Sequence, residues 1–529
     1  MITYVKSYDW GIIGSLSIVL GTVVVLTDIG SRLPFLLLIA ALTLLLIPIA
    51  VDKIILKRKI DFFEPHYIFI ITVLLHFLLP AITFLSPNRS YSPQILGLAL
   101  FAVILCCISF FSGYYSRRYS QHVRKFKIRD ERVYRSVRFS PSNKTTEYSL
   151  TPIDLSDNRR SKKASSSIND SIHIRYSTKI ILAASMLLMV IGFLGALNIL
   201  SAVGGVQALF SLMTHRLDLF KFISGVDITL MRLFRLPFYL VLVIAFFKAQ
   251  WRLSLLPPLA IAFVGIMSVG LFTGNRGDFL APILIFMTFS NYQRKRIAPH
   301  QLMLFSILAV IFLLSYLVFV RSPYLSSRLI GFGIQGFLQF LWEESFGKNT
   351  FVEIRPMMDV IQWMPDKLDF QYGRTYLALF THYIPRTILP SKLQGGAEIF
   401  ALAFYPERWL RGAGGLRVST FGELYMNFSW AGLVLGSFGL GWLMSFFYQS
   451  FAKRVSDARY TIIYSIIIVS FYFILRGNFV LIVSQIIIDV SLVYVILQIA
   501  RIPKTRPRKQ VSGMQPKNLS VSIAGNHGQ

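Results

Sequence analysis

The sequence predicts an all-α, polytopic membrane protein with about twelve transmembrane helices, because its apolar residues form uninterrupted blocks of roughly the twenty residues that cross ~30 Å of hydrocarbon. Hydrophobic residues make up 54% of the 529-residue chain and charged residues only 15%. A soluble domain carries charges at about a quarter of its positions. A soluble nucleic-acid-binding protein is therefore excluded, although the net charge is +29, and nucleic acid is not an expected partner.

The apolar blocks fall into three groups that two long loops separate. Four blocks lie in residues 1–114, five in 180–320 and three in 425–500. The block at 279–291 is too short for a full crossing, so it predicts a tilted or broken helix paired with the block at 254–273. In chain order the blocks are 10–27, 33–51, 66–86, 93–114, 180–200, 233–248, 254–273, 279–291, 302–320, 425–447, 460–475 and 480–500.

Lysine and arginine concentrate in alternate loops. Under the positive-inside rule, this pattern places both termini, the basic loop 115–179 and the basic tail 501–529 in the cytoplasm. The loop 115–179 has almost no apolar periodicity, so we expect a disordered or surface-lying segment held near anionic lipid headgroups. Cys106 and Cys107 are adjacent within one apolar block, so no disulfide framework is expected.

The loop 321–424 falls on the opposite, outer side. It mixes acidic and basic residues and is rich in aromatic ones, so we expect short interfacial helices that lie over the bundle. Arginine outnumbers lysine in the segments placed outside. The planar arginine fork binds phosphate bidentately and stays charged. This bias favours a diphosphate-bearing partner, although contact with lipid headgroups or loop carboxylates is the better explanation for any single arginine.

Several signatures of other chemistries are missing from the sequence. It has no P-loop, no GxGxxG that opens a helix, no HExxH, no CxxC and no Asp-x-Asp pair of the kind that holds a metal on a nucleotide-sugar. ATP-driven and metal–nucleotide chemistry are therefore disfavoured, and we expect neither a metal nor a cofactor.

Two candidate sites precede the end of the outer loop. Arg276 stands in the polar turn between two apolar blocks, where it either lines a cavity or pairs with Asp278. His382 and Arg386 follow an apolar run near an expected helix end. His382 is a candidate general base, although a lone histidine is more often structural.

Two more candidates lie further along the chain. Arg411 and Arg417 bracket a glycine-rich stretch that forms either an anion-binding concavity or only a turn. The residues from Thr420 to Glu423 then match a capping box, which makes Glu423 either a cap or a base. Asp489 lies near the middle of the last span and either carries protons in a transporter or pairs with a polar neighbour. A face of small residues predicts close helix packing: Gly432, Gly436, Gly439 and Gly441.

Three segments, GNRGDFLAPIL, THYIPRTILPSKLQGGAEIF and STFGELYMNFSWAGLVLGSFGLGWL, together resemble the Wzy-type O-antigen and capsule polysaccharide polymerases. The likeness covers mainly residues 180–500. It implies a bacterial inner-membrane enzyme that joins oligosaccharide repeat units on the periplasmic side. The donor would be a glycan on undecaprenyl diphosphate, and the acceptor a newly flipped repeat unit on the same lipid. A chain-length regulator and a flippase are implied as partners.

The resemblance assigns displacement at an anomeric carbon, with arginines stabilising the departing diphosphate and a base accepting the acceptor's proton. The expected diphosphate ligands are Arg276, Arg386, Arg411 and Arg417, the expected base is His382 or Glu423, and the expected sugar-stacking residues are Tyr383, Tyr405 and Trp409. Two alternatives stay open. An O-antigen ligase would share the spans and the chemistry, and a transporter of polysaccharide or lipid-linked oligosaccharide would use Asp489.

Overall fold

The structure is a computed structural model. It describes residues 33–55, 60–85, 91–138, 175–205, 225–247, 255–273, 276–293, 352–384, 388–410, 417–455 and 457–502, with a few single positions between 207 and 308. The predicted span at 10–27 lies outside these residues, and the one at 302–320 lies almost entirely outside them.

Helices make up nearly all of the described chain. Eight helical stretches within it are long and apolar enough to cross a membrane, and further apolar helices are shorter, so the protein is an all-α polytopic membrane protein, as predicted. The helices of the first half are α2 (Leu33–Ala50), η2 (Val51–Ile55), α3 (Pro65–Val73), η3 (Leu74–Leu78), α4 (Leu79–Phe84), α5 (Pro93–Arg138), α7 (Thr178–Val203), α10 (Gly225–Arg232), α11 (Arg235–Phe247), α12 (Leu256–Thr273) and α13 (Arg276–Gln293). Those of the second half are α17 (Ile354–Trp363), α18 (Arg374–Thr381), α19 (Gly396–Phe404), α20 (Pro406–Leu410), α21 (Thr420–Ala452), α22 (Ala458–Leu475) and α23 (Phe479–Ile499).

α13 and α5 extend beyond their predicted apolar blocks. α13 has 18 residues, because the charged residues of the preceding turn join its first turn. Asp278 stands there, where a negative charge is stabilised by the helix dipole. The block at 279–291 is thus the greater part of an unbroken 18-residue helix that packs against α12, as the predicted pairing requires, while its tilt stays a prediction. α5 continues as a helix to Arg138, well past the predicted end of its span at residue 114.

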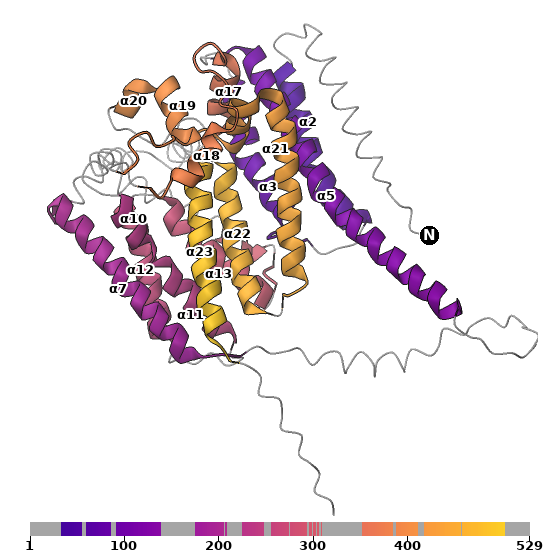
Figure 1. Ribbon diagram of the computed structural model, residues 1–529. Coiled ribbons are helices and arrows are strands. Elements are labelled where there is room, and N and C mark those ends of the chain that lie inside the picture. The colour runs from indigo at the N-terminus through magenta and orange to yellow at the C-terminus, as the bar shows by residue number, and fades with distance from the viewer. Residues whose placement is uncertain are drawn as a thin grey trace, which may run out of the picture.

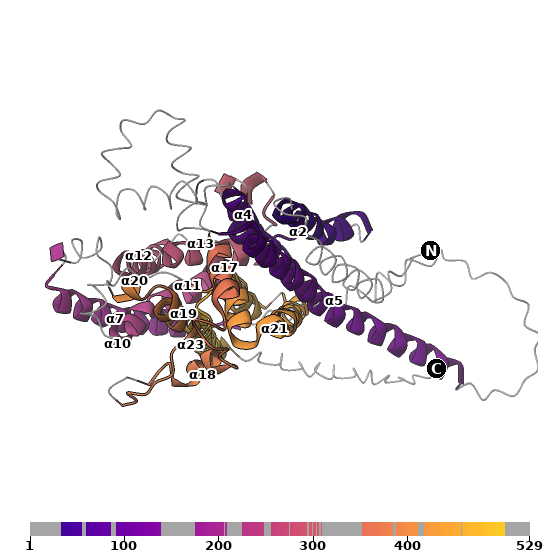
Figure 2. The same ribbon diagram turned by 90° about the horizontal axis from the view of Figure 1, so that it is seen from above.

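The helices form one bundle with a cap of short helices at one end (Figure 1). α5 lies between α2 and α21, as the view from above shows (Figure 2). α7, α10, α11 and α12 pack together on another side of the bundle. The short helices α17 to α20 lie over the upper end of the bundle in Figure 1. The described parts of the loop 321–424 thus include short helices that lie over the bundle.

α21 is interrupted, and the loop before α18 fills the gap. Phe428 and Ser429 have non-helical backbone angles, with φ of −139° and 55°. The backbone N–H groups of Gln371 and Tyr372 donate to the carbonyls of Met426 and Asn427, both at 3.0 Å. A kink releases carbonyls from the helical ladder, and here a neighbouring loop pairs with two of them. α18 is thereby fixed to the outer part of α21.

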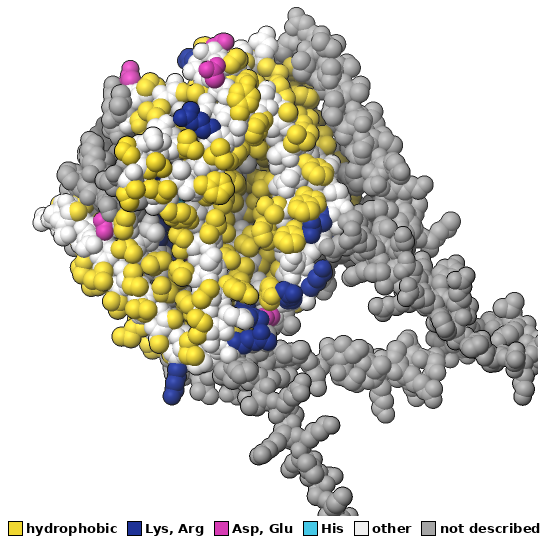
Figure 3. Space-filling view, in the orientation of Figure 1, with side chains coloured by type: hydrophobic (Ala, Val, Ile, Leu, Met, Phe, Trp, Pro, Cys, Tyr) yellow, Lys and Arg dark blue, Asp and Glu magenta, His cyan; other side chains and the backbone are white. Residues whose placement is uncertain are grey.

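Segments that the charge pattern places on one side of the membrane meet at one end of the bundle. Tyr91 donates to Asp359 Oδ1 at 2.6 Å at the end that carries the short helices. Tyr176 donates to Asp457 Oδ1 at 3.0 Å at the other end, where β1 (Arg175–Tyr176) pairs with β2 (Arg501–Ile502). Hydrophobic side chains cover the face in Figure 3, and most of its visible Lys and Arg lie toward the lower end.

Candidate functional site

Two arginines meet one carboxylate at the end of the bundle that carries the short helices. Arg476, which follows α22, donates from Nε to Glu353 Oε1 at 3.3 Å. Arg417, just before α21, lies close enough for its charge to act on both Arg476 and Glu353. Glu353 is buried, with 7% of its surface exposed. The pair of guanidinium groups therefore outweighs this carboxylate in a place with little water.

His76 and Tyr472 complete this group, which we call the arginine cluster: Arg417, Arg476, Glu353, His76 and Tyr472. His76 Nε2 lies 3.1 Å from the Tyr472 hydroxyl, and His76 Nδ1 lies 3.9 Å from Glu353 Oε1. The backbone N–H of Glu353 also donates to the His76 carbonyl at 3.0 Å. Glu353 occupies the N-cap position of α17, yet its side chain makes no capping hydrogen bond. It is turned into the bundle instead.

A close backbone contact brings the two arginines together. Gly477 has φ of 107°, in the left-handed region that favours glycine. A Cβ atom on Gly477 would lie 1.9 Å from the Val418 carbonyl oxygen. The turn between α22 and α23 therefore presses against the strand-like segment that begins α21. Because Arg476 precedes this glycine and Arg417 precedes Val418, the contact brings the two arginines near enough for their charges to interact.

The electrostatics of the cluster suit an anion and a proton acceptor. Burial, and next the charge of Arg476, lower the pKa of Arg417, while Glu353 and Asp278 oppose that shift. Burial raises the pKa of Glu353, and the charges of Arg476 and Arg417 oppose it. A bound phosphate group would relieve the repulsion between the guanidinium groups. A buried carboxylate with a raised pKa is also a suitable general base.

A second group of charges adjoins the arginine cluster within the membrane. Asp278 forms an ion pair with Arg235, and its charge also acts on Arg417. Asp489 is 6% exposed and lies in the field of Arg235 and Arg232. These two acidic and two basic residues balance one another. The geometry agrees with the interpretation in which Asp489 pairs with polar neighbours on other helices.

Of the four predicted diphosphate ligands, the structure places Arg417 in the cluster. Arg386 and Arg411 lie outside the described residues. Arg276 is the first residue of α13, but its side chain also lies outside the described part. Asp278, two residues later, has Arg235 as an ion-pair partner.

His382 caps the C-terminal end of α18 and is half-buried. Burial lowers the pKa of His382, and the positive charges of Lys392 and Arg232 lower it further. Its imidazole is therefore held neutral, as a general base requires. Arg232 connects His382 to the charges around Asp489.

The capping box predicted at Thr420 is wrong. Ser419 is the N-cap residue, and its Oγ accepts from the Gly422 N–H at 3.1 Å. The Thr420 hydroxyl instead donates to the Ile474 carbonyl. Glu423 is 1% exposed, and a Cβ on Gly396 would lie 2.5 Å from its Oε1. The helix thus begins one residue earlier than predicted, so Glu423 lies one position too far along it to act as the cap and packs against α19.

The three aromatic residues assigned to sugar stacking differ in accessibility. Tyr383 is 50% exposed and Trp409 is 37% exposed. The Tyr383 hydroxyl donates to the Ser484 carbonyl at 2.6 Å, which leaves its ring at the surface. Tyr405 is half-buried. Its hydroxyl donates to Asp359, and its ring lies 5.8 Å from that of Phe400, so Tyr405 already serves to join α17 and α19.

Four members of the arginine cluster were not assigned to the site from the sequence. Arg476 is visible as a charge between two apolar blocks, and His76 as a titratable residue inside another block. In both cases the signal is a charged or titratable side chain where the membrane makes such a group costly in free energy. Glu353 is one of several carboxylates in its loop, and nothing in its sequence context distinguishes it. Tyr472 has no distinguishing signal either.

The fold and the site define a polytopic membrane protein with two arginines gathered around a buried carboxylate at one end of its bundle. Residues 12–506 match the family model described as O-antigen polysaccharide polymerase Wzy. This match covers nearly the whole chain, so the protein belongs to that family and is a polysaccharide polymerase of the membrane. No match was found among curated proteins or among solved structures.

Proposed function

We propose that this protein polymerises oligosaccharide repeat units carried on undecaprenyl diphosphate, at the periplasmic face of the bacterial inner membrane. The observation that carries the proposal is the pair Arg417 and Arg476, which share the buried carboxylate of Glu353. A cation pair at the end of the helix bundle, beside short amphipathic helices, suits a lipid-borne diphosphate. Membership of the O-antigen polymerase family supports a glycan as the group transferred.

In the proposed reaction, an acceptor hydroxyl oxygen attacks the anomeric carbon of the donor glycan. The bond from that carbon to the phosphate oxygen breaks, and the lipid diphosphate leaves with the electron pair. Arg417 and Arg476 stabilise the charge that develops on the leaving group. They also supply the positive charge that a metal ion supplies in other glycosyl transfers, so the proposed chemistry is metal-independent.

Glu353 is the base that the geometry favours in this proposal. Its pKa is raised by burial, and it lies against Arg476 and near His76. When a diphosphate attracts the arginines, the Glu353 carboxylate is released to accept the acceptor's proton. His382 is the alternative base, because its imidazole is neutral and half-buried. Glu423 is the least favoured, because it is enclosed against α19.

The test is the length distribution of the surface polysaccharide made by point variants in cells. Arg417→Ala and Arg476→Ala should each reduce polymerisation by a factor of about 10² to 10³, the cost of losing one stabilising donor. Arg374→Ala, an exposed arginine at the start of α18, is the matched control and should keep the full-length ladder. Correctly folded Arg417→Ala and Arg476→Ala proteins that both make full-length polymer would refute the assignment.

The same assay separates a polymerase from a ligase. Loss of a polymerase leaves single repeat units attached to the lipid A core, whereas loss of a ligase leaves polymer on its lipid carrier. Variants of Arg276, Arg386 and Arg411 belong in the same series, since they remain proposed diphosphate ligands.

A further inference from the structure

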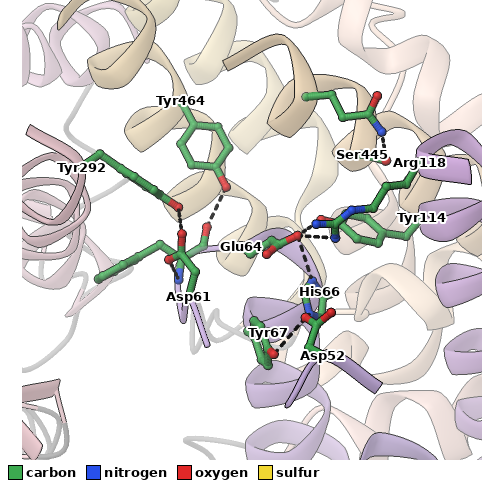
Figure 4. Close-up of polar contacts among 12 residues, drawn as sticks. Asp52, Asp61, Glu64, His66, Tyr67, Tyr114, Arg118, Tyr292, Ser445 and Tyr464 are labelled. Carbon is green, nitrogen blue, oxygen red and sulfur yellow. Dashed lines mark hydrogen bonds and ion pairs between the residues drawn. The ribbon is translucent and has the colours of Figure 1, made fainter. Parts of the chain in front are cut away.

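Three residues of the kinds that bind metal ions meet at the opposite end of the bundle. Asp52 lies in η2, Glu64 just before α3, and His66 in the first turn of α3. One potential ligand atom from each lies within 4.8 Å of the others. Asp52, Glu64 and His66 are 2%, 5% and 0% exposed. Figure 4 shows the three side chains pointing toward one another.

The local backbone directs these side chains inward. η2 is a π-helical turn that continues α2, and such turns often occur at functional sites. Glu64 occupies the N-cap position of α3, but it makes no side-chain capping hydrogen bond. An N-cap acidic side chain ordinarily accepts from the first helical N–H groups. That of Glu64 points instead toward His66, with Nδ1 of His66 at 3.7 Å from its Oε1.

A second layer of donors holds the carboxylates in place. Tyr67 donates to Asp52 Oδ2 at 3.0 Å. Tyr114 and Arg118 donate to Glu64 Oε1 at 2.8 and 2.7 Å. Hydrogen bonds of this kind orient the ligands of a metal site and are usually needed for its affinity. The carboxylates are therefore fixed before any ion arrives.

Among the residues that the structure describes, acidic side chains outnumber basic ones in the immediate surroundings of this cluster, which favours the binding of a cation. Asp52, Glu64 and the nearby Asp61 are all buried, and Arg118 is the positive group that contacts Glu64. His66 Nδ1 is buried and makes no hydrogen bond, while its Nε2 is at hydrogen-bond distance, 3.1 Å, from Asp52 Oδ2. A buried nitrogen without a hydrogen bond is an uncommon and costly feature.

We propose that Asp52, Glu64 and one ring nitrogen of His66 bind a divalent transition-metal ion. Two carboxylate oxygens with one imidazole nitrogen suit Zn²⁺, Mn²⁺ or Fe²⁺, whereas Mg²⁺ and Ca²⁺ prefer oxygen ligands alone. The distance of 3.1 Å between His66 Nε2 and Asp52 Oδ2 is about that between two ligands held near 2.1 Å from one ion. The ion would fasten η2 to the start of α3, and through Glu64 to α5.

The site is separate from the proposed reaction. His66 and His76 stand on one continuous helical stretch, Pro65–Phe84, and ten residues of helix span about 15 Å. The proposal therefore concerns the architecture of the cytoplasmic side and does not depend on the polymerase chemistry. The occupant that competes with a metal is a proton on His66, which would place an imidazolium between the two carboxylates.

The test uses the purified full-length chain in detergent. Metal is removed with a chelator, Zn²⁺ is added at about 10 μM, and bound metal is counted by mass spectrometry. We expect about one equivalent in the wild-type chain and in His300→Asn, and none in His66→Asn. His300 is exposed, which makes it the matched control. A wild-type chain that binds no zinc, or a His66→Asn variant that binds as much as wild type, overturns the proposal.

A spectroscopic measurement covers the case in which His66→Asn does not fold. Co²⁺ added to the wild-type chain should give visible absorption bands typical of a nitrogen- and oxygen-ligated ion, and Zn²⁺ should abolish them. The wild-type thermal midpoint should also rise with Zn²⁺ and fall with chelator, because ligand binding to the folded state stabilises it. Absent bands and an unchanged midpoint would assign the cluster to a protonated histidine and overturn the metal site.

Discussion

Replacing Gly441 with alanine tests how closely α5 and α21 approach one another. A Cβ on Gly441 would lie 2.1 Å from the Phe110 carbonyl oxygen, and a Cβ on Gly113 would lie 2.0 Å from the Phe438 carbonyl oxygen. Real Cβ contacts essentially never fall below 3.0 Å. Because the obstacle is backbone, no rotamer change can relieve it, and the helices must separate by about 0.9 Å, the difference between 2.1 and 3.0 Å.

Gly439 is the matched control, because it lies on the same helix and a Cβ there would meet nothing within 4 Å. Both substitutions gain the same helix propensity, about 1 kcal/mol, so that gain cancels in the comparison. The remaining difference is the cost of overpacking, about 1–3 kcal/mol and more when a rigid backbone is involved. We expect Gly441→Ala to be less stable than Gly439→Ala by at least this amount.

The assay is thermal unfolding of the two detergent-solubilised variants, followed by the fraction that elutes as a single species in size-exclusion chromatography. Gly439→Ala should match or slightly exceed the wild-type midpoint, and Gly441→Ala should melt several degrees lower. Equal midpoints for the two variants would show that the backbones of α5 and α21 do not touch as described, and would refute the argument.

Three further predictions concern buried carboxylates. If Glu353 is the base, polymerisation should fall as the pH drops toward its pKa, which burial raises above the ordinary 4.5. Glu353→Gln should therefore be slow at every pH and lack this acidic limb; an unchanged limb in that variant would exclude Glu353. Asp359→Asn weakens the hydrogen bonds from Tyr91 and Tyr405 and should destabilise the protein by about 1.5–3 kcal/mol. The control is Asp366→Asn, at an exposed position, which should leave the unfolding midpoint unchanged. Equal midpoints for the two variants would contradict the predicted role of Asp359. Asp489→Asn leaves buried arginine charge uncompensated and should lower the thermal midpoint, at a cost of about 3–5 kcal/mol. A stable Asp489→Asn protein that polymerises normally but has lost substrate movement would instead favour a transporter.

The sequence locates the arginine cluster only in part. Arg417 is identified because it stands beside a glycine-rich stretch before an apolar block, which is a local signal. Glu353 is more than sixty residues away in the chain, and its partners His76 and Arg476 belong to other spans. No local pattern connects these three residues, because their proximity results from the packing of η3, α17 and α22.

The small-residue face of α21 shows the same division. The sequence predicts close packing along this face, and Gly441 confirms it through its contact with α5. Gly439 belongs to the same series, yet it faces open space. The glycines in the sequence indicate that one face of the helix lacks bulky side chains. Only the position of α5 decides which of these glycines is required for close packing.

By itself the sequence determined that this chain is a bundle of membrane-spanning helices, because hydrocarbon requires long apolar blocks with their backbone hydrogen bonds satisfied internally. Its segments also indicated the polymerase family. The tertiary structure decided which charges meet. Buried charges are stable only beside a partner, and the partners of Arg476, Asp278 and Asp489 lie on distant helices. Partner choice across the bundle depends on helix packing, which local sequence does not encode.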